Sequence, residues 1–422
     1  MNEVPRQRRA LTNVGGAIRA HGDSKLGAIF ARALERTATE PPDVATHGFH
    51  AWPARMHWAL PASIFEALGA RGAQVLDPFA GGGTVLVEAM RAGAHGTGID
   101  LNPLSALVIE TKCSLRTDDD IDAFLEVATS VVEASLERVQ SRTPIKADIH
   151  RDLGVLYAPH VQKELAGLLA EIETVESMRD RRALGALFSS LVVKLSMKKA
   201  DTSDEIVDKR LRKGLASELF ARKAEELSRR WEELRAHVPR DAEEPRLMTG
   251  DVRWATRLLG ERYRADLVVT SPPYGGTYDY HAHHALRLAW LRMDDRAFAQ
   301  GELGARRSLR GPEARARFDD EVLHMLGAIR RVVKDEGLVV LVIGDAEIRQ
   351  QRVSPIEQLD ALAPRAGLRL VAGASEEKLD FRGGPSREEH VLALSPIKAR
   401  AERARSPARS AAPRGRGTTR RG

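Results

Sequence analysis

The sequence is poor in cysteine, in aromatic residues and in long apolar runs. Cys113 is the single cysteine among 422 residues, which excludes an internal disulfide and a cysteine metal cluster. No apolar stretch approaches the roughly 18 residues that a membrane-spanning helix needs. The opening MNEVPRQRRA has no apolar segment behind its charges. We therefore expect a cytoplasmic protein without membrane contact, in which Cys113 is a small core residue.

The positive charge is concentrated at the C-terminal end. The formal net charge is +6, but the residues from 397 onward carry Lys398 and eight arginines against Glu402. This end alone has a net charge of +8, so the rest of the chain carries about −2. Because the segment is rich in Arg, Ala, Pro, Ser and Gly without apolar periodicity, we expect a disordered tail. It could hold nucleic-acid phosphates by counterion release, or it could serve only to solubilise the protein.

Short apolar runs that alternate with helical periods predict an α/β fold. AQVLDPF and AHGTGIDL are typical of strands, and TVLVEAMRAG and PLSALVIETKCSL of helices, so together they predict a βαβ unit and a parallel sheet. Charged helical patterns then follow for about 120 residues, before strand patterns return at ADLVVTS, GLVVLVIGD, LRLVAG and EEHVLALS. We predict five regions: an N-terminal extension (1–45), a first α/β part (46–115), a helical insertion (116–245), a second α/β part (246–396) and the basic tail (397–422).

A glycine-rich turn, DPFAGGGT, follows the first predicted strand and begins with Asp77. Consecutive glycines let the backbone approach a ligand, and the next helix offers free N–H groups at its N-terminus. A dinucleotide fingerprint needs glycines spaced as GxGxxG, and an acidic first residue repels a pyrophosphate. An adenosine that carries a positive amino-acid arm fits this turn better.

Asp100 ends the second predicted strand, 23 residues after Asp77. This is near the spacing at which a carboxylate accepts hydrogen bonds from ribose hydroxyls. The two acidic residues and the glycines together favour a nucleoside site. The alternative is that the glycines only make a tight turn and that Asp100 caps the next helix.

Two motifs resemble those of a known enzyme family. DPFAGGGT with Asp100 resembles the cofactor loop of class I S-adenosylmethionine-dependent methyltransferases, and TSPPY (270–274) resembles the catalytic motif of the amino methyltransferases that act on cytosine N4 or adenine N6. FHAWPARMH (49–57) is similar to the segment that closes over the methionine part of the cofactor, and GDVR (250–253) resembles the position near its adenine. The resemblance covers about residues 47–112 and 245–395.

The resemblance implies a Rossmann-like methyltransferase sheet of seven strands with the last one antiparallel, and S-adenosyl-L-methionine as the cofactor. The residues that it assigns to the cofactor are Asp77, Phe79, Gly81, Gly83, Thr84, Asp100, Asp251 and His57. In several of these families the target-recognition region follows the catalytic motif, whereas the large insertion precedes it here. We expect this insertion to help bind the target.

The SPPY tetrapeptide can continue neither a strand nor a helix, because proline fixes its own φ and restrains the residue before it. An exocyclic base amine is a poor nucleophile until acceptors at its two hydrogens localise the lone pair. The Ser271 hydroxyl and the Pro272 carbonyl are candidates, held in direction by the prolines, including Pro273. Tyr274 would stack on a base that has left its duplex. This chemistry requires no metal.

The sequence therefore favours a DNA methyltransferase, such as one from a restriction-modification system. A serine at position 271 is commoner in the cytosine N4 enzymes of the resembled families, but adenine N6 stays open. RNA base-amine methylation is a rival, and a nucleic-acid-binding protein without catalysis is a rival of another class. Arg306, Arg307 and Arg310 lie in a predicted loop where they could clamp phosphates, or they could be ordinary surface charge.

Overall fold

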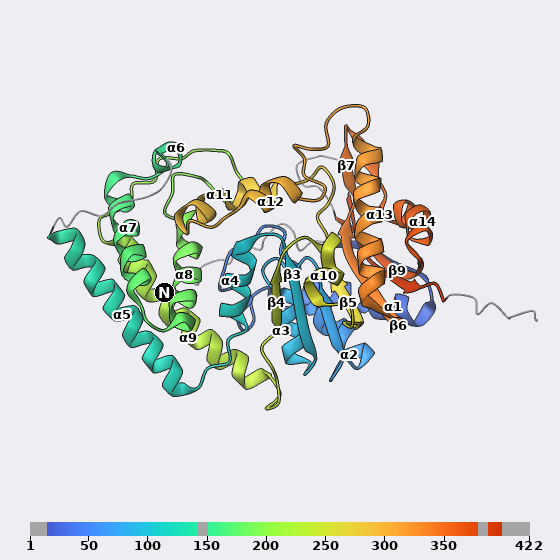
Figure 1. Cartoon of the computed structure of the whole chain (residues 1–422), viewed down its shortest axis with the longest axis horizontal. Coiled ribbons are helices and arrows are strands. Elements are labelled where there is room, and N and C mark those ends of the chain that lie inside the picture. The colour runs from blue at the N-terminus through green and yellow to red at the C-terminus, as the bar shows by residue number, and fades with distance from the viewer. Residues whose placement is uncertain (1–14, 142–150, 379–386, 399–422) are drawn as a thin grey trace, which may run out of the picture.

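The computed structural model describes residues 15–141, 151–378 and 387–398. A sheet of eight strands lies at its centre, in the order β1-β9-β10-β6-β5-β2-β3-β4 (Figure 1). The strands are β1 (Gly15–Gly22), β2 (Gln74–Asp77), β3 (His95–Asp100), β4 (Arg246–Thr249), β5 (Ala265–Thr270), β6 (Val333–Gly344), β9 (Leu368–Lys378) and β10 (Arg387–Pro396). A separate hairpin is formed by β7 (Ala346–Ile348) and β8 (Gln351–Val353).

The strands β4, β3, β2, β5 and β6 run parallel, and β10 is antiparallel to both of its neighbours, β6 and β9. This confirms the α/β fold and the antiparallel final strand. From β2 the chain moves outward to β3 and β4 and then returns to the other side of β2 as β5. The order therefore reverses between β2 and β5, and such switch points are where α/β sheets bind ligands.

The eighth strand, β1, was not predicted. It lies in the expected N-terminal extension and pairs antiparallel with β9 at the edge of the sheet. Its sequence, GGAIRAHG, has no apolar run that would indicate a strand. A strand at the exposed edge of a sheet can form without one, since few of its side chains are buried. The helix after it packs on β1 and β9, so residues 15 to 39 belong to the α/β core rather than to an extension.

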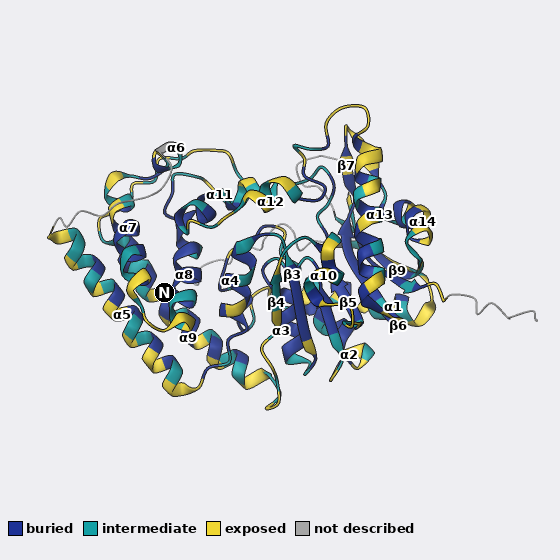
Figure 2. Ribbon diagram, viewed as in Figure 1, coloured by how far each residue is buried: buried dark blue, intermediate teal, exposed yellow. Residues whose placement is uncertain are grey.

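Helices cover both faces of the sheet because its strands alternate their buried side chains between two cores. Val75 and Val269 contribute to one core with α1 (Ser24–Thr39), α2 (Ala59–Leu68) and α3 (Thr84–Arg91). Leu76 and Val268 contribute to the other with α10 (Ala255–Leu259), α13 (Ala314–Val332) and α14 (Pro355–Leu362). Two short 3₁₀ helices, η2 (Val252–Trp254) and η3 (Pro364–Ala366), adjoin this second layer. Figure 2 shows the strands as the most buried part of the molecule.

The predicted helical insertion is formed by α5 (Asp118–Gln140), α6 (Arg151–Gly154), α7 (Pro159–Thr174), α8 (Met178–Val192) and α9 (Leu215–His237). It lies beside the sheet, with α4 (Pro103–Lys112), α11 (Tyr280–Trp290) and α12 (Arg296–Gly301) between the two parts (Figure 1). The insertion shares one hydrophobic core with α4 and α11. At its centre the indole N–H of Trp231 on α9 donates to the Thr111 carbonyl of α4 over 2.7 Å. The insertion is therefore fastened to the α/β part through α4.

Within the described residues, no helix combines the length and the apolar character needed to cross a membrane. Of the basic tail, residues 399–422 lie outside the described part of the chain.

Candidate functional site

A pocket that is partly open to solvent lies where the chain leaves β2, β3 and β5, at the switch point of the sheet. It brings together residues from the glycine-rich turn, the second strand end, the GDVR segment and SPPY. The predicted site residues that line it are Asp77, Phe79, Gly81, Thr84, Asp100, Asp251, Ser271 and Pro273. Two motifs that are about 190 residues apart in the chain thus face the same cavity.

The glycines of DPFAGGGT shape one wall of the cavity. Gly81 and Gly83 have φ of 50° and 78°, in the left-handed region that favours glycine. A Cβ on Gly83 would lie 2.7 Å from the Ile109 side chain, and one on Gly82 would lie 3.1 Å from the Trp52 ring. Only glycine therefore fits between α4 on one side and the cavity with Trp52 on the other.

Asp77 lies at the end of β2 and is 3% exposed. Its Oδ1 accepts a hydrogen bond from the Thr270 hydroxyl over 2.7 Å and another from the Phe79 amide over 3.2 Å. Burial raises the pKa of the Asp77 carboxyl to about 7, and the two hydrogen bonds only partly oppose this. Asp77 is an acidic group that needs a cation nearby in order to ionise fully at neutral pH.

Asp100 connects the glycine-rich turn with the start of α4. Its Oδ2 accepts from the Gly81 amide over 2.6 Å, and its Oδ1 accepts from the Asn102 amide over 2.8 Å. Burial raises the pKa of Asp100 to about 6, against the effect of these hydrogen bonds. Asn102, rather than Asp100, caps α4 by accepting from the Leu104 amide. The capping role considered for Asp100 from the sequence therefore belongs to its neighbour.

SPPY directly follows the end of β5, as the sequence predicts, and two of its four residues face the cavity. Ser271 and Pro273 line the cavity, whereas Pro272 and Tyr274 do not. The Tyr274 ring packs against Gly344, where a Cβ would lie 3.0 Å from its Cε2 atom. Burial raises the pKa of Tyr274 well above its ordinary value, which a hydrogen bond from Ser271 opposes. Within the described residues every peptide bond is trans, including those of SPPY.

The segment FHAWPARMH reaches the cavity through residues other than the expected His57. Trp52, Arg55 and Met56 line the cavity, and His57 and Gly83 do not. The Nδ1 of His57 accepts from the Ala59 amide at the start of α2. Trp52 was the better candidate because a large ring next to a proline can cover a ligand.

Helices α11 and α12 supply further lining residues. The His284 ring lies 4.4 Å from the Trp52 ring, centroid to centroid, and both residues line the cavity with Tyr280, Phe298 and Glu302. The HAHH run (281–284) shortly after SPPY indicates a helix that could line a base channel, whereas nothing in the sequence singles out Phe298 or Glu302. Asp251 caps η2 and forms an ion pair of 2.5 Å with Arg253.

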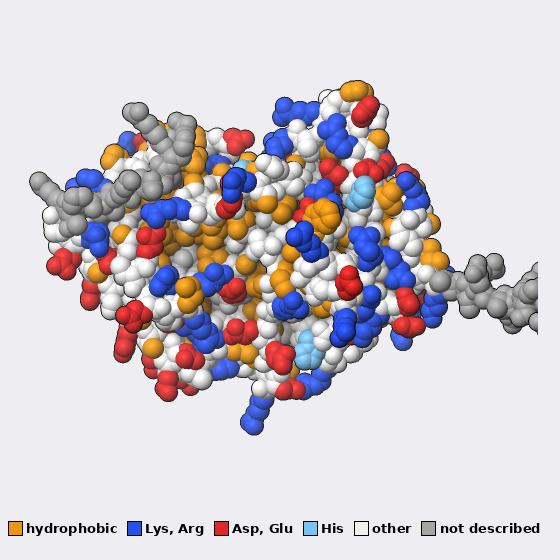
Figure 3. Space-filling model, viewed as in Figure 1, with side chains coloured by type: hydrophobic (Ala, Val, Ile, Leu, Met, Phe, Trp, Pro, Cys, Tyr) orange, Lys and Arg blue, Asp and Glu red, His pale blue; other side chains and the backbone are white. Residues whose placement is uncertain are grey.

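The three predicted phosphate-binding arginines lie in one loop but differ in their freedom. Arg306 and Arg310 are exposed, and Arg306 is 3.5 Å from Asp279. Arg307 already pairs with Glu302 over 2.6 Å and donates to the Ala299 carbonyl. Arg307 therefore supports the loop, whereas the other two are accessible. Across the face in Figure 3, basic side chains are interspersed with acidic ones.

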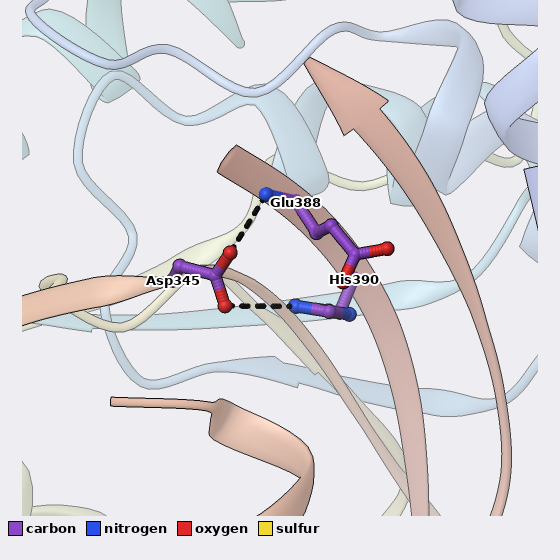
Figure 4. A group of neighbouring side chains, drawn as sticks. All are labelled: Asp345, Glu388 and His390. Atoms are coloured by element: carbon purple, nitrogen blue, oxygen red, sulfur yellow. Dashed lines mark hydrogen bonds and ion pairs between the residues drawn. The ribbon is translucent and has the colours of Figure 1, made fainter. Parts of the chain in front are cut away.

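A cluster of possible metal ligands, Asp345, Glu388 and His390, lies where β6 and β10 meet, away from the cavity residues (Figure 4). Asp345 accepts from the Glu388 amide over 2.7 Å and lies 3.5 Å from the His390 Nε2. Arg352 pairs with both carboxylates, and Arg19 pairs with Glu388. Arginines already neutralise these carboxylates. We therefore assign the cluster a structural role, in which its ion pairs and hydrogen bonds join the end of β6 to β10.

The fold and the site together define an α/β protein with a cavity at the switch point of its sheet. No protein-family model matches the chain. Among curated proteins, it is 22% identical over 257 residues to the type II methyltransferase M.BsoBI of Geobacillus stearothermophilus, covering 56% of this chain and 50% of that protein. It is 24% identical over 252 residues to the type II methyltransferase M.AvaI of Nostoc sp., covering 56% and 52%. The chain thus spans about half the length of the curated relatives it matches.

Solved structures similar to the chain include TrmN from Thermus thermophilus, with 15% identity, a TM-score of 0.29 and coverage of 81% of this chain and 49% of that one. The rRNA methyltransferase aviRa from Streptomyces viridochromogenes has 15% identity, a TM-score of 0.32 and coverage of 86% and 96%. Because these TM-scores are low, we assign the fold from the strand order of this chain alone.

Proposed function

We propose that this protein is an S-adenosylmethionine-dependent DNA methyltransferase that acts on an exocyclic base amine, with cytosine N4 as the target atom. One observation carries the proposal: residues of the glycine-rich turn and of SPPY line the same cavity. A cofactor on the turn and an amine at Ser271 would therefore share this cavity. The similarity to two type II methyltransferases supports the same conclusion.

The cavity suits the cofactor in its lining, charge and backbone geometry. Apolar side chains line much of it, and a few polar groups converge there, as in small-molecule sites. Asp77 and Asp100 supply negative charge for a cationic ligand and acceptors for ribose hydroxyls, and the glycines allow close approach. When bound, S-adenosylmethionine supplies an electrophilic methyl group on a sulfonium.

Ser271, which lines the cavity, would then prepare the nucleophile together with the carbonyl of Pro272, a residue that does not itself line the cavity. Two acceptors at the amine hydrogens localise the nitrogen lone pair and direct it into the cavity, and the prolines fix the direction of both acceptors. A preorganised polar contact of this kind contributes about 10²- to 10³-fold to the rate. The base must leave its duplex to reach Ser271, which costs a few kcal/mol.

Separate observations bear on the base and on the polymer. The serine at position 271 favours cytosine N4 over adenine N6. The type II relatives favour DNA over RNA, and the helical insertion beside the cavity is the candidate region for target binding. Methylation of an adenine N6 or of an RNA base amine is the second candidate function.

Incubation of the purified protein with methyl-labelled cofactor and either unmethylated genomic DNA or total RNA tests the proposal. The nucleosides are then separated and identified by mass spectrometry. We expect label in N4-methyldeoxycytidine, and none with the Ser271→Ala variant. Label in N6-methyladenine or in ribonucleosides would establish the second candidate. Cofactor binding without label in any nucleoside would overturn the methyltransferase proposal.

A further inference from the structure

Two side chains of helix α4 donate hydrogen bonds to backbone carbonyl groups of the glycine-rich turn. The Ser105 hydroxyl donates to the Gly81 carbonyl over 2.6 Å, and the Lys112 ammonium donates to the Gly82 carbonyl over 2.5 Å. Ser105 is 0% exposed and Lys112 is 1% exposed. Two successive carbonyls of the turn are thus fixed by two buried side chains from the same helix.

These contacts decide where the amide between the two glycines points. In a trans peptide the N–H group points opposite to the C=O group. Because Ser105 holds the Gly81 carbonyl on the α4 side, the Gly82 N–H points to the other side of the turn. Both glycines line the cavity there, and within the described residues no backbone carbonyl accepts from the Gly82 amide. This amide is a donor directed to the ligand side.

Burying the Lys112 ammonium costs free energy, and an apolar side chain could fill the same position without that cost. Burial lowers the pKa of Lys112 to about 7, and the nearby Arg55 lowers it further. Its hydrogen bond is to a carbonyl rather than to a carboxylate. Burying an amine costs free energy unless it is hydrogen-bonded. The contact to Gly82 is the hydrogen bond that offsets this cost.

We propose that Ser105 and Lys112 are positioning residues, which orient the turn so that the Gly82 N–H meets the carboxylate of the ligand's amino-acid arm. The inference rests on the proposed function, since it assumes a ligand with such an arm. The N-terminus of α3, which begins two residues later at Thr84, favours a carboxylate at the same place.

The test compares two ligands by calorimetric titration. S-adenosylhomocysteine has the amino-acid arm, whereas 5′-methylthioadenosine keeps the adenosine and lacks the arm. We expect Ser105→Ala and Lys112→Met each to weaken binding of S-adenosylhomocysteine about three- to tenfold, and to change binding of methylthioadenosine less than twofold. This selectivity separates positioning of the arm from a general loss of structure.

Thr111→Val is the matched control. Thr111 is a buried hydroxyl of the same helix that donates to the Leu107 carbonyl over 2.8 Å and not to the turn. We expect unchanged affinity for both ligands. If Lys112→Met does not fold, Ser105→Ala decides the test.

Equal weakening of both ligands, or no weakening of either, would overturn the positioning role and leave the proposed function standing. Failure of the unaltered protein to bind either ligand would overturn both.

Discussion

The pH dependence of cofactor binding should follow the ionisation of Asp77. Burial raises the pKa of this carboxyl to about 7 in the ligand-free protein, whereas the cationic cofactor needs the carboxylate. Binding must therefore drive off a proton wherever Asp77 is protonated. We expect affinity to increase as the pH rises from 5 to 7.

The magnitude follows from the ionised fraction. With a pKa of about 7, half of the Asp77 carboxyls are ionised at pH 7 and about 1% at pH 5. If only the ionised form binds, the dissociation constant is about 50-fold higher at pH 5, a difference of about 2.3 kcal/mol. Asp100, with a pKa of about 6, adds to the slope if its ionised form is also required.

Stability should respond in the opposite direction. The folded-state pKa of Asp77 lies above its ordinary value of 3.8, so the folded protein holds the proton more tightly than the unfolded chain. This contribution is fully present below about pH 4 and is lost as the pH rises to about 7, up to roughly 4 kcal/mol. Asp77→Asn should flatten this dependence.

Calorimetric titration from pH 5 to 7, in buffers of different ionisation enthalpy, measures both the affinity and the protons released. Urea unfolding over the same range measures stability. An affinity that does not change with pH, or an Asp77→Asn variant with the same slope as the unaltered protein, would refute the assignment of the cationic ligand to Asp77.

Three further predictions concern other parts of the site and its support. Ser271→Ala should lower methyl transfer at least 10²-fold while cofactor affinity, measured by titration, stays within about twofold; loss of folding instead would contradict the role assigned to Ser271. Asp100→Ala should weaken cofactor binding by about 10-fold or more, because charge-assisted hydrogen bonds are lost, and unchanged affinity would remove Asp100 from the site. Arg287→Met should lower the free energy of unfolding, measured in urea, by about 2 to 4 kcal/mol. The substitution removes the buried guanidinium that lies 2.5 Å from the Asp201 carboxylate. An unchanged urea midpoint would mean that water replaces this ion pair.

The parts of the site that follow strands could be predicted from the sequence. Asp77, Asp100 and Ser271 come directly after apolar runs, and parallel strands bring their carboxyl ends to one edge of the sheet. The helical insertion was also predictable, because its apolar positions recur with helical spacing over long segments. These features depend on local pattern and on one general rule of topology.

Other features depend on contacts that no local pattern records. Strand β1 is held by its pairing with β9, more than 340 residues away, and its own sequence is polar. Lys112 and Ser105 look like ordinary residues of a helix, and only the packing of α4 on the turn gives them their role. FHAWPARMH is a segment that reaches the cavity, but the choice between Trp52 and His57 required the direction of each side chain.

Helix α4 has one face in the core of the insertion, where Trp231 donates to Thr111, and another against the glycine-rich turn. A small displacement of this helix would therefore be felt at both places. If the insertion grips the target, target binding and cofactor binding become thermodynamically linked through α4. If target binding changes the affinity for the cofactor by some factor, cofactor binding must change the affinity for the target by the same factor. Each ligand would then strengthen or weaken the binding of the other to an equal degree.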